Sequence, residues 1–190
     1  MAGPEVTLRA IARLGARERV LIAARRGAES DMPEADQVAA LLDCVHALDR
    51  AAIPYALIGG LAVGVHSQVP RATLDVDLAV PTSLPRERLV AVLSAAGFAL
   101  SGEYPHSLNF RHAGGEPVQL ARDPQFDPMI ARAEATLVGT TQVRIVRKDD
   151  LIEMKCRAAA DPARRRSKAL RDEADVALLR GDTPDPDEGW

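Results

Sequence analysis

Hydrophobic and polar residues along this chain follow two periods, one typical of helices and one typical of strands. Helical spacing runs through residues 5–28, where Gly15 could interrupt it. It resumes in a second helix that has Pro33 in its first turn and ends at Pro54. The apolar face of this second helix is formed by Val38, Leu41, Leu42, Val45 and Leu48. We therefore expect a helical arm ahead of the first strand.

A strand, a glycine turn, a helix and another strand are expected next. Residues 55–58 form the first strand and run into Gly59-Gly60, residues 61–66 begin a helix, and the stretch 71–80 contains the second strand, which Pro81 ends. Further along, the pattern predicts helices over 84–98, 128–137, 151–156 and 168–179, strands over 106–112, 117–121 and 142–147 with a hairpin turn at Gly114-Gly115, and an extended tail from Gly181.

Length and composition indicate one globular domain with a helical extension, and the predicted mixture of strands and helices is of the α/β (α+β) class. The 190 residues suffice for a core and a helical extension, and 47% hydrophobic with 27% charged residues is typical of folded proteins. A net charge of −3 gives no overall basic surface for nucleic acid or membrane. We divide the chain into an N-terminal helical extension (1–52), an α/β core (53–147) and C-terminal helices with a Pro/Asp-rich tail (148–190).

The cysteines, the apolar runs and the first residues indicate in which compartment the protein is expected. Cys44 and Cys156 are too few for a disulfide framework and fall in helical patterns, which favours buried thiols in a reducing compartment. The chain has no run of about 18 apolar residues, so we expect no membrane-spanning helix. The first residues lack the basic-then-apolar order of a secretory signal. We expect a cytoplasmic protein without a membrane partner.

Asp75 and Asp77 are the most informative residues of the chain. Side chains two apart in a strand point to the same face, so these carboxylates are expected to converge while Leu74, Val76 and Leu78 face a core. Two like charges this close repel each other unless a cation neutralises them. Mg²⁺ is often held by one or two carboxylates together with substrate phosphates. The spacing therefore predicts a divalent metal site.

Gly59 and Gly60 precede this pair by about fifteen residues. A glycine turn ahead of a helix lets backbone N–H groups approach a phosphate closely. Each feature also has a simpler explanation, because an Asp-x-Asp on a surface strand and a Gly-Gly turn without a ligand are both common. Their combination in the order strand, Gly-Gly, helix, strand favours a joint metal and phosphate site.

These segments resemble a known family. The runs Ile58-Gly-Gly-Leu-Ala-Val-Gly-Val-His66 and Arg71-x-Thr73-x-Asp75-x-Asp77 resemble the nucleotidyltransferase superfamily, in its minimal bacterial branch of AbiEii/AbiGii-type toxins and their relatives. Asp150-Leu-Ile-Glu-Met-Lys155 and Arg171-Asp-x-x-Asp175 resemble the helical segment of the same group. The likeness covers most of the chain.

The resemblance implies a short mixed sheet with flanking helices, followed by a helical segment. It implies that a nucleoside triphosphate binds over Gly59 and Gly60 and that the paired aspartates hold Mg²⁺ or Mn²⁺. Arg71 and Thr73 flank the aspartates and could either position the nucleotide or simply support the strand. In active members a nucleotidyl group passes to a hydroxyl on protein or RNA, for which tRNA is a candidate here. Such transfer needs positioning and charge neutralisation more than covalent chemistry from the protein.

Two basic features could assist this chemistry. The resemblance implies that Lys155 faces phosphate in the catalytic site, whereas its alternative role is on a solvated helix face. The cluster Arg164-Arg-Arg-Ser-Lys168 is either a solvated surface or a contact for triphosphate or RNA.

Gln119 departs from the family pattern. Active members usually add a third carboxylate from a later strand, but the corresponding strand here reads Val118-Gln119-Leu120. An amide oxygen can ligate a metal, but it is neutral and cannot act as a base. Glu116 and Asp123 are the nearest other acids; Glu116 has the wrong strand parity and Asp123 lies past the strand end.

Three functions stay open at this point. The first is a Mg²⁺-dependent nucleotidyltransferase, which could be the toxin of a toxin–antitoxin pair. The second, suggested by Gln119, is a catalytically silent nucleotide- or RNA-binding module. The third is an interaction protein that uses the N-terminal helices to bind a cognate partner, as the neutralising half of such a pair would.

Overall fold

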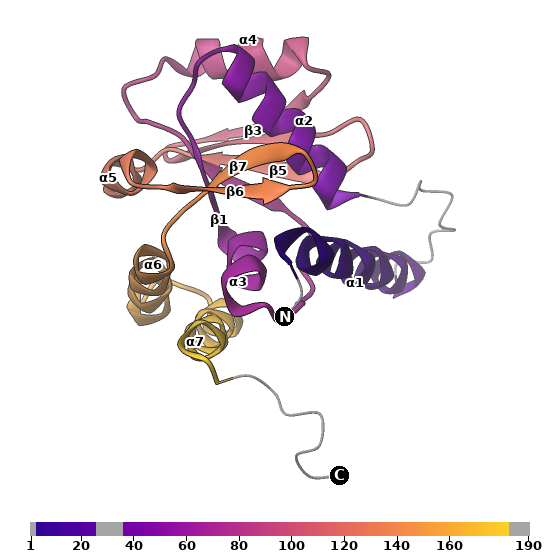
Figure 1. The fold of residues 1–190 in the computed structure, drawn as a ribbon, viewed down its shortest axis with the longest axis vertical. Helices are drawn as coiled ribbons and strands as arrows, with labels where there is room; N and C mark the ends of the chain where they lie inside the picture. The colour runs from indigo at the N-terminus through magenta and orange to yellow at the C-terminus, as the bar shows by residue number, and fades with distance from the viewer. Residues whose placement is uncertain (1–2, 26–35, 183–190) are drawn as a thin grey trace.

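The structure, a computed structural model, describes residues 3–25 and 36–182. In these residues, helices flank a seven-stranded mixed sheet with the order β3-β4-β5-β2-β1-β7-β6 (Figure 1). The strands are β1 (Ala56–Ile58), β2 (Val76–Ala79), β3 (Ala99–Tyr104), β4 (Ser107–Arg111), β5 (Pro117–Ala121), β6 (Glu134–Val138) and β7 (Thr141–Ile145). The helices are α1 (Pro4–Arg25), α2 (Gln37–Arg50), α3 (Gly59–Ser67), α4 (Arg86–Ala95), α5 (Asp127–Ala131), α6 (Lys148–Ala160) and α7 (Arg166–Arg180), with a 3₁₀ turn η1 (Pro124–Phe126). The expected α/β class is confirmed.

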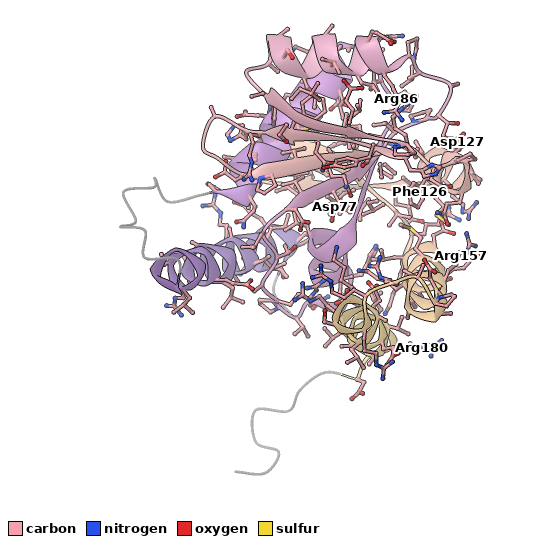
Figure 2. All side chains as sticks on the ribbon, turned by 180° about the vertical axis from the view of Figure 1, so that it is seen from behind. Asp77, Arg86, Phe126, Asp127, Arg157 and Arg180 are labelled. Carbon is pink, nitrogen blue, oxygen red and sulfur yellow. The ribbon has the colours of Figure 1, made fainter. Side chains whose placement is uncertain are left out.

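The helices form one layer on each side of the sheet. Helices α2 and α4 cover one face, and α1, α3, α6 and α7 lie on the other (Figures 1 and 2). Within the second layer α3 contacts α1, α6 and α7, so it is the element that joins them. None of the described helices has the length and apolar character needed to cross a membrane.

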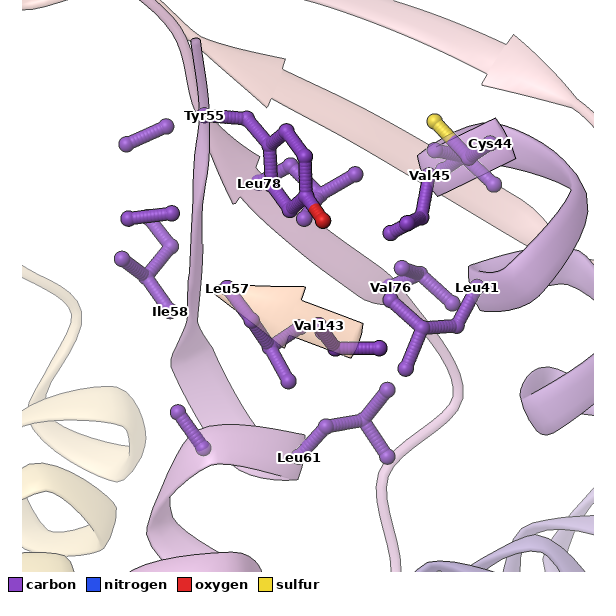
Figure 3. Close-up of a cluster of buried hydrophobic side chains, with 14 of the residues drawn as sticks. Leu41, Cys44, Val45, Tyr55, Leu57, Ile58, Leu61, Val76, Leu78 and Val143 are labelled. Carbon is purple, nitrogen blue, oxygen red and sulfur yellow. The ribbon is translucent and has the colours of Figure 1, made fainter. Parts of the chain in front are cut away.

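A row of leucines across four neighbouring strands forms the core beneath α2. Leu57 in β1 is paired with Leu78 in β2, which lies beside Leu120 in β5, and Leu120 is paired with Leu108 in β4. All four are fully buried, and Leu41 of α2 packs in the same cluster (Figure 3). Burial of each such side chain stabilises the fold by about 2 kcal/mol relative to exposure.

Several expected elements are confirmed. The predicted hairpin is the antiparallel pair β4 and β5, and its turn contains Gly115 with φ +90°. The helix expected over 84–98 is α4, and those expected over 151–156 and 168–179 are α6 and α7, which extend further.

Two expectations about residues 99–138 were wrong. The helix expected over 128–137 stops at Ala131, and residues 134–138 instead form β6, which pairs with β7 through a turn at Gly139. Strand β3 was not expected, because its side chains are mostly exposed and show no alternation. Both are edge strands, where pairing with a neighbour rather than a buried face defines the strand.

Gly15 does not interrupt α1, which is continuous. A Cβ at Gly15 would lie 2.4 Å from Gln37 Nε2 and 2.6 Å from the carbonyl oxygen of Thr73. The glycine therefore permits close packing of α1 against α2 and against the segment that leads to β2. Pro33, residues 26–28 and the tail from 183 onward lie outside the described residues.

Candidate functional site

A polar row crosses the sheet one residue along from the leucine row. Asp77 in β2 lies beside Gln119 in β5, and Gln119 is paired with Asn109 in β4. Because adjacent residues of a strand face opposite sides, these three side chains point away from α2 and α4. Gln119 Nε2 donates a hydrogen bond to Asn109 Oδ1 at 3.2 Å. The position expected for a third acid therefore holds an amide that is itself bound to an amide.

Asp75 lies one residue before β2, so the strand starts later than expected. Its side chain is exposed, whereas Asp77 is partly buried. The buried Thr73 donates its hydroxyl to Asp75 Oδ1 at 2.8 Å, which orients this carboxylate. Leu74, which was expected in the core, is only half-buried.

The Gly59-Gly60 turn packs directly against this carboxylate pair. Gly59 has φ +68°, and a Cβ there would lie 2.1 Å from Asp77 Oδ2. A Cβ on Gly60 would lie 2.8 Å from Thr73 Oγ1. No side chain fits at such distances, and a positive φ further favours glycine. The turn therefore brings bare backbone into contact with the acidic residues.

Helix α3 starts at this turn with a free N-terminus. It follows β1 directly, has no side-chain cap and has no acidic residue in its first turn. The first N–H groups of a helix lack intrahelical partners, and the helix dipole favours an anion there. A phosphate could therefore bind at Gly59 and Gly60, next to Asp77.

Asp77 resists ionisation in the metal-free protein. Burial, and after it the charge of Asp75, raises the pKa of Asp77 from an ordinary value of 3.8 to about 7. The cations Lys155, Arg71 and Lys168 act in the opposite direction. A bound divalent cation would favour the charged form of this carboxylate, since an opposite charge nearby stabilises it.

A buried ion network joins α7 to α6 and to the segment before β2. Arg71 Nε lies 2.8 Å from Asp175 Oδ1, and Lys155 Nζ lies 2.8 Å from Asp175 Oδ2. Lys155 Nζ also lies 2.9 Å from Asp172 Oδ1, and Arg164 Nε lies 2.5 Å from Asp172 Oδ2. The two carboxylates are 2–3% exposed. Each buried charge is thus paired, as its desolvation requires.

A cleft of about 680 Å³ runs between the sheet and α6. Gly59, Asp77 and Gln119 line its sheet side, and Lys155 and Arg164 line its helical side. The volume falls within the range of roughly 300–1,000 Å³ that small-molecule sites occupy. Figure 2 labels Asp77 on β2 and Arg157 on α6, which both line the cleft.

The donor set fits a divalent cation that is completed by substrate. Within residues 3–25 and 36–182, no group of three or more His, Cys, Asp or Glu side chains could hold a metal ion. Asp75 and Asp77 supply two carboxylates, and Gln119 adds a neutral oxygen beside Asp77. Mg²⁺ commonly takes one or two carboxylates, with waters and substrate phosphates as its other ligands.

Lys155 is neither on a solvated helix face nor a free cation. Its side chain is 14% exposed, and Nζ is held between Asp172 and Asp175 at the wall of the cleft. Arg71 likewise belongs to the ion network, and of the basic cluster Arg164 lines the cleft.

The other acids near β5 are occupied. Glu116 is buried, lies 2.8 Å from His112 Nδ1 and accepts the backbone N–H of Asp36. Asp123 accepts the backbone N–H of Gln125 and caps η1. Neither replaces the third acid at Gln119.

The sequence analysis gave no role in the site to two groups of residues. Asp172 and Asp175 appeared there only within the family-like Arg171–Asp175 run, although they stand three apart on one buried stripe of α7. Gln125 and Phe126 enter the cleft from η1, and nothing in the local sequence pattern pointed to them.

Comparison with known proteins supports the fold. No protein-family model and no curated protein matches the chain. The solution structure of the antibiotic-resistance factor ANT(2'')-Ia is 19% identical, with a TM-score of 0.57 over 77% of this chain and 85% of that one. The crystal structure of ANT(2'')-Ia in complex with adenylyl-2''-tobramycin is also 19% identical, with a TM-score of 0.56 over 77% of this chain and 90% of that one. The lincomycin-bound lincosamide antibiotic adenylyltransferase LnuA is 14% identical, with a TM-score of 0.55 over 75% of this chain and 96% of that one. The chain has a nucleotidyltransferase-like fold.

Proposed function

We propose that this protein is a metal-dependent nucleotidyltransferase that transfers a nucleotidyl group from a nucleoside triphosphate to a hydroxyl. The observation that carries the proposal is the contact of the Gly59-Gly60 turn with Asp77 at the uncapped start of α3. This contact brings together a backbone suited to phosphate and a carboxylate suited to a cation. The fold shared with ANT(2'')-Ia and LnuA supports the same reaction class.

Each residue has a defined role in this proposal. Asp75 and Asp77 would hold Mg²⁺ or Mn²⁺, and the N–H groups of Gly59 and Gly60 would bind the phosphates. The buried hydroxyl of Thr73 orients Asp75. When bound, the cation would neutralise phosphate charge and polarise the reacting phosphoryl group.

The cations at the cleft would stabilise negative charge on the triphosphate. Arg71, Lys155 and Arg164 face two carboxylates in the ion network, which leaves one excess positive charge near the phosphates. In the transfer step the acceptor oxygen bonds to the α-phosphorus and its proton passes to water. The bond from the α-phosphorus to the bridging oxygen breaks, and pyrophosphate leaves.

The proposal also covers the acceptor hydroxyl and the biological setting of the reaction. The resemblance of Asp150–Lys155 and Arg171–Asp175 to AbiEii-type proteins supports a hydroxyl on protein or on RNA such as tRNA. It also supports a toxin of a toxin–antitoxin pair with a cognate partner protein. The ANT(2'')-Ia and LnuA crystal structures hold adenylyl-2''-tobramycin and lincomycin, so a small-molecule hydroxyl is the acceptor to compare.

A second candidate function is a nucleotide-binding module without transferase activity. Gln119 favours it, because its amide is neutral and is bound to Asn109 rather than available as a base.

Binding and transfer separate the two candidates. Calorimetry with each of the four nucleoside triphosphates plus Mg²⁺ should show binding that is lost in Asp77→Ala. A matched control is Asp49→Asn, which removes an exposed carboxylate from α2 on the opposite side of the sheet. Absence of binding for every nucleotide by the folded protein would refute both candidates.

Transfer is then measured with α-labelled nucleotides and protein, tRNA or small-molecule acceptors. Label that appears with the wild type and disappears in Asp77→Ala supports the transferase. Binding without transfer supports the silent module.

A further inference from the structure

The cleft has a second end that the phosphate and metal chemistry does not use. Phe126 from η1 and Met154 from α6 line it, and both are only partly buried. Phe126 is one of three phenylalanines in the chain, and the other two, Phe98 and Phe110, are fully packed in the core. Phe126 packs against the core but is partly exposed, and a partly exposed aromatic ring inside a cleft offers a surface for stacking.

A polar pair stands beside this apolar surface. Arg157 Nη1 donates to Gln125 Oε1 at 2.5 Å, and Arg157 Nη2 donates to Glu153 Oε1 at 2.6 Å. Gln125 and Arg157 both line the cleft. Since the carbonyl oxygen of Gln125 is already engaged, its Nε2 group remains as a hydrogen-bond donor. The pair therefore presents N–H groups to a ligand.

The two ends of the cleft lie on different sides of α6. Lys155 is tied to Asp175 on α7, next to the phosphate end. Arg157, two residues later, is tied to Gln125 on η1. Figure 2 shows Phe126 and Arg157 near the same edge of the molecule, and both line the cleft. A ligand with a charged end and a planar end could span both.

We infer that this second end binds the base of the nucleotide, with Phe126 as a stacking surface and Gln125 and Arg157 as donors to the edge of the base. This inference rests on the proposed function, which places the phosphates at Gly59 and Gly60. An aromatic ring can stack on any base, because every base has a π-face. Adenine accepts only at its ring nitrogens and carries an amino donor where guanine carries O6, so neighbouring donors favour the bases with ring carbonyls (uracil, cytosine and guanine) over adenine.

The stacking part is tested by binding without turnover. Calorimetry compares inorganic tripolyphosphate with the four nucleoside triphosphates, each with Mg²⁺. The nucleotides should bind more tightly than tripolyphosphate, and Phe126→Ala should weaken all four by about tenfold while leaving tripolyphosphate unchanged. Tyr104→Ala is the control, because it removes an exposed aromatic ring from the edge strand β3.

The selective part is tested with Gln125→Glu. This substitution keeps the shape and the contact with Arg157 but removes the amide donor. The preference for carbonyl-bearing bases over ATP should then fall, whereas repulsion by the new carboxylate should weaken tripolyphosphate and all four nucleotides alike and by itself leave that preference unaffected. A preference that persists in Gln125→Glu overturns the assignment of the donor.

Failure of this inference can be distinguished from failure of the proposed function. If the nucleotides and tripolyphosphate bind equally, or if Phe126→Ala leaves nucleotide affinity intact, the base site is refuted while the phosphate site stands. If nothing binds to the folded wild type, both are refuted.

Discussion

Replacement of Asp77 by asparagine should stabilise the metal-free protein at neutral and alkaline pH. The native state raises the pKa of Asp77 from 3.8 to about 7, so between these values it binds a proton that the unfolded chain has lost. The wild type therefore loses stability as the pH rises from about 4 through 7. Asparagine resembles the protonated carboxyl and carries no such cost.

The size of the effect follows from the shift in pKa. A pKa difference of about three between the native and unfolded states changes the free energy of unfolding by at most roughly 4 kcal/mol. Because part of the Asp77 side chain contacts solvent, we expect a gain of about 2 kcal/mol at pH 8. At pH 4 and below, both proteins should have nearly equal stability.

Urea denaturation at pH 4, 5.5, 7 and 8 without divalent metal measures this gain. Asp75→Asn serves as the comparison, and its gain should be smaller because that carboxylate is exposed. With Mg²⁺ added at several times its dissociation constant, the wild type should gain of order 1 kcal/mol by mass action and Asp77→Asn should gain little. Equal stability of the two proteins at every pH, or an undiminished Mg²⁺ response in the mutant, would show that Asp77 is not a cation site.

Three further predictions address the turn, the ion network and the thiols. Gly59→Ala should abolish Mg²⁺–nucleotide binding in calorimetry, because the new Cβ displaces the adjacent carboxylate of Asp77. The control Gly97→Ala, at φ +87° with open space around it, should lower the free energy of unfolding by only about 1–2 kcal/mol and leave binding intact. Asp175→Asn should lower the free energy of unfolding in urea by about 3–5 kcal/mol because two buried cations lose their shared partner, and a loss below 1 kcal/mol would contradict the network. Burial raises the pKa of the Cys44 thiol, whereas Cys156, which was expected to be buried, is exposed. A thiol reagent should therefore label only Cys156 in the native protein and both cysteines in urea, and two labels in the native state would argue against the packing of α2.

The sequence predicted the centre of the sheet well because local pattern and tertiary pairing agree there. In Val118-Gln119-Leu120 the alternation of apolar and polar residues matches a strand with one covered face, and β5 has that form. The same alternation places Gln119 beside Asp77 on the face that lines the cleft. Where one face of a strand is buried, the polar residues that line a site can thus be read from the sequence.

The edges of the sheet and the cleft could not be predicted in this way. Residues 131–135 are rich in alanine and charge, which favours a helix, but pairing with β7 outweighs that preference from residue 134 onward. The contact between Arg71 and Asp175 joins positions 104 residues apart, so no local pattern reveals it. The second end of the cleft depends on a single 3₁₀ turn that orients Gln125 and Phe126.

The order of strands in the sheet has a consequence for synthesis of the chain. The interior strand β1 is flanked by β2, which follows closely, and by the parallel strand β7, which begins only at Thr141. While the nascent chain is shorter than this, β1 has no partner on one side and presents an open edge that can pair with other chains. We expect ribosome-bound fragments that end before β7 to be captured by chaperones, and the Gly59-Gly60 turn, which follows β1 directly, to take its final shape only after β7 has been synthesised.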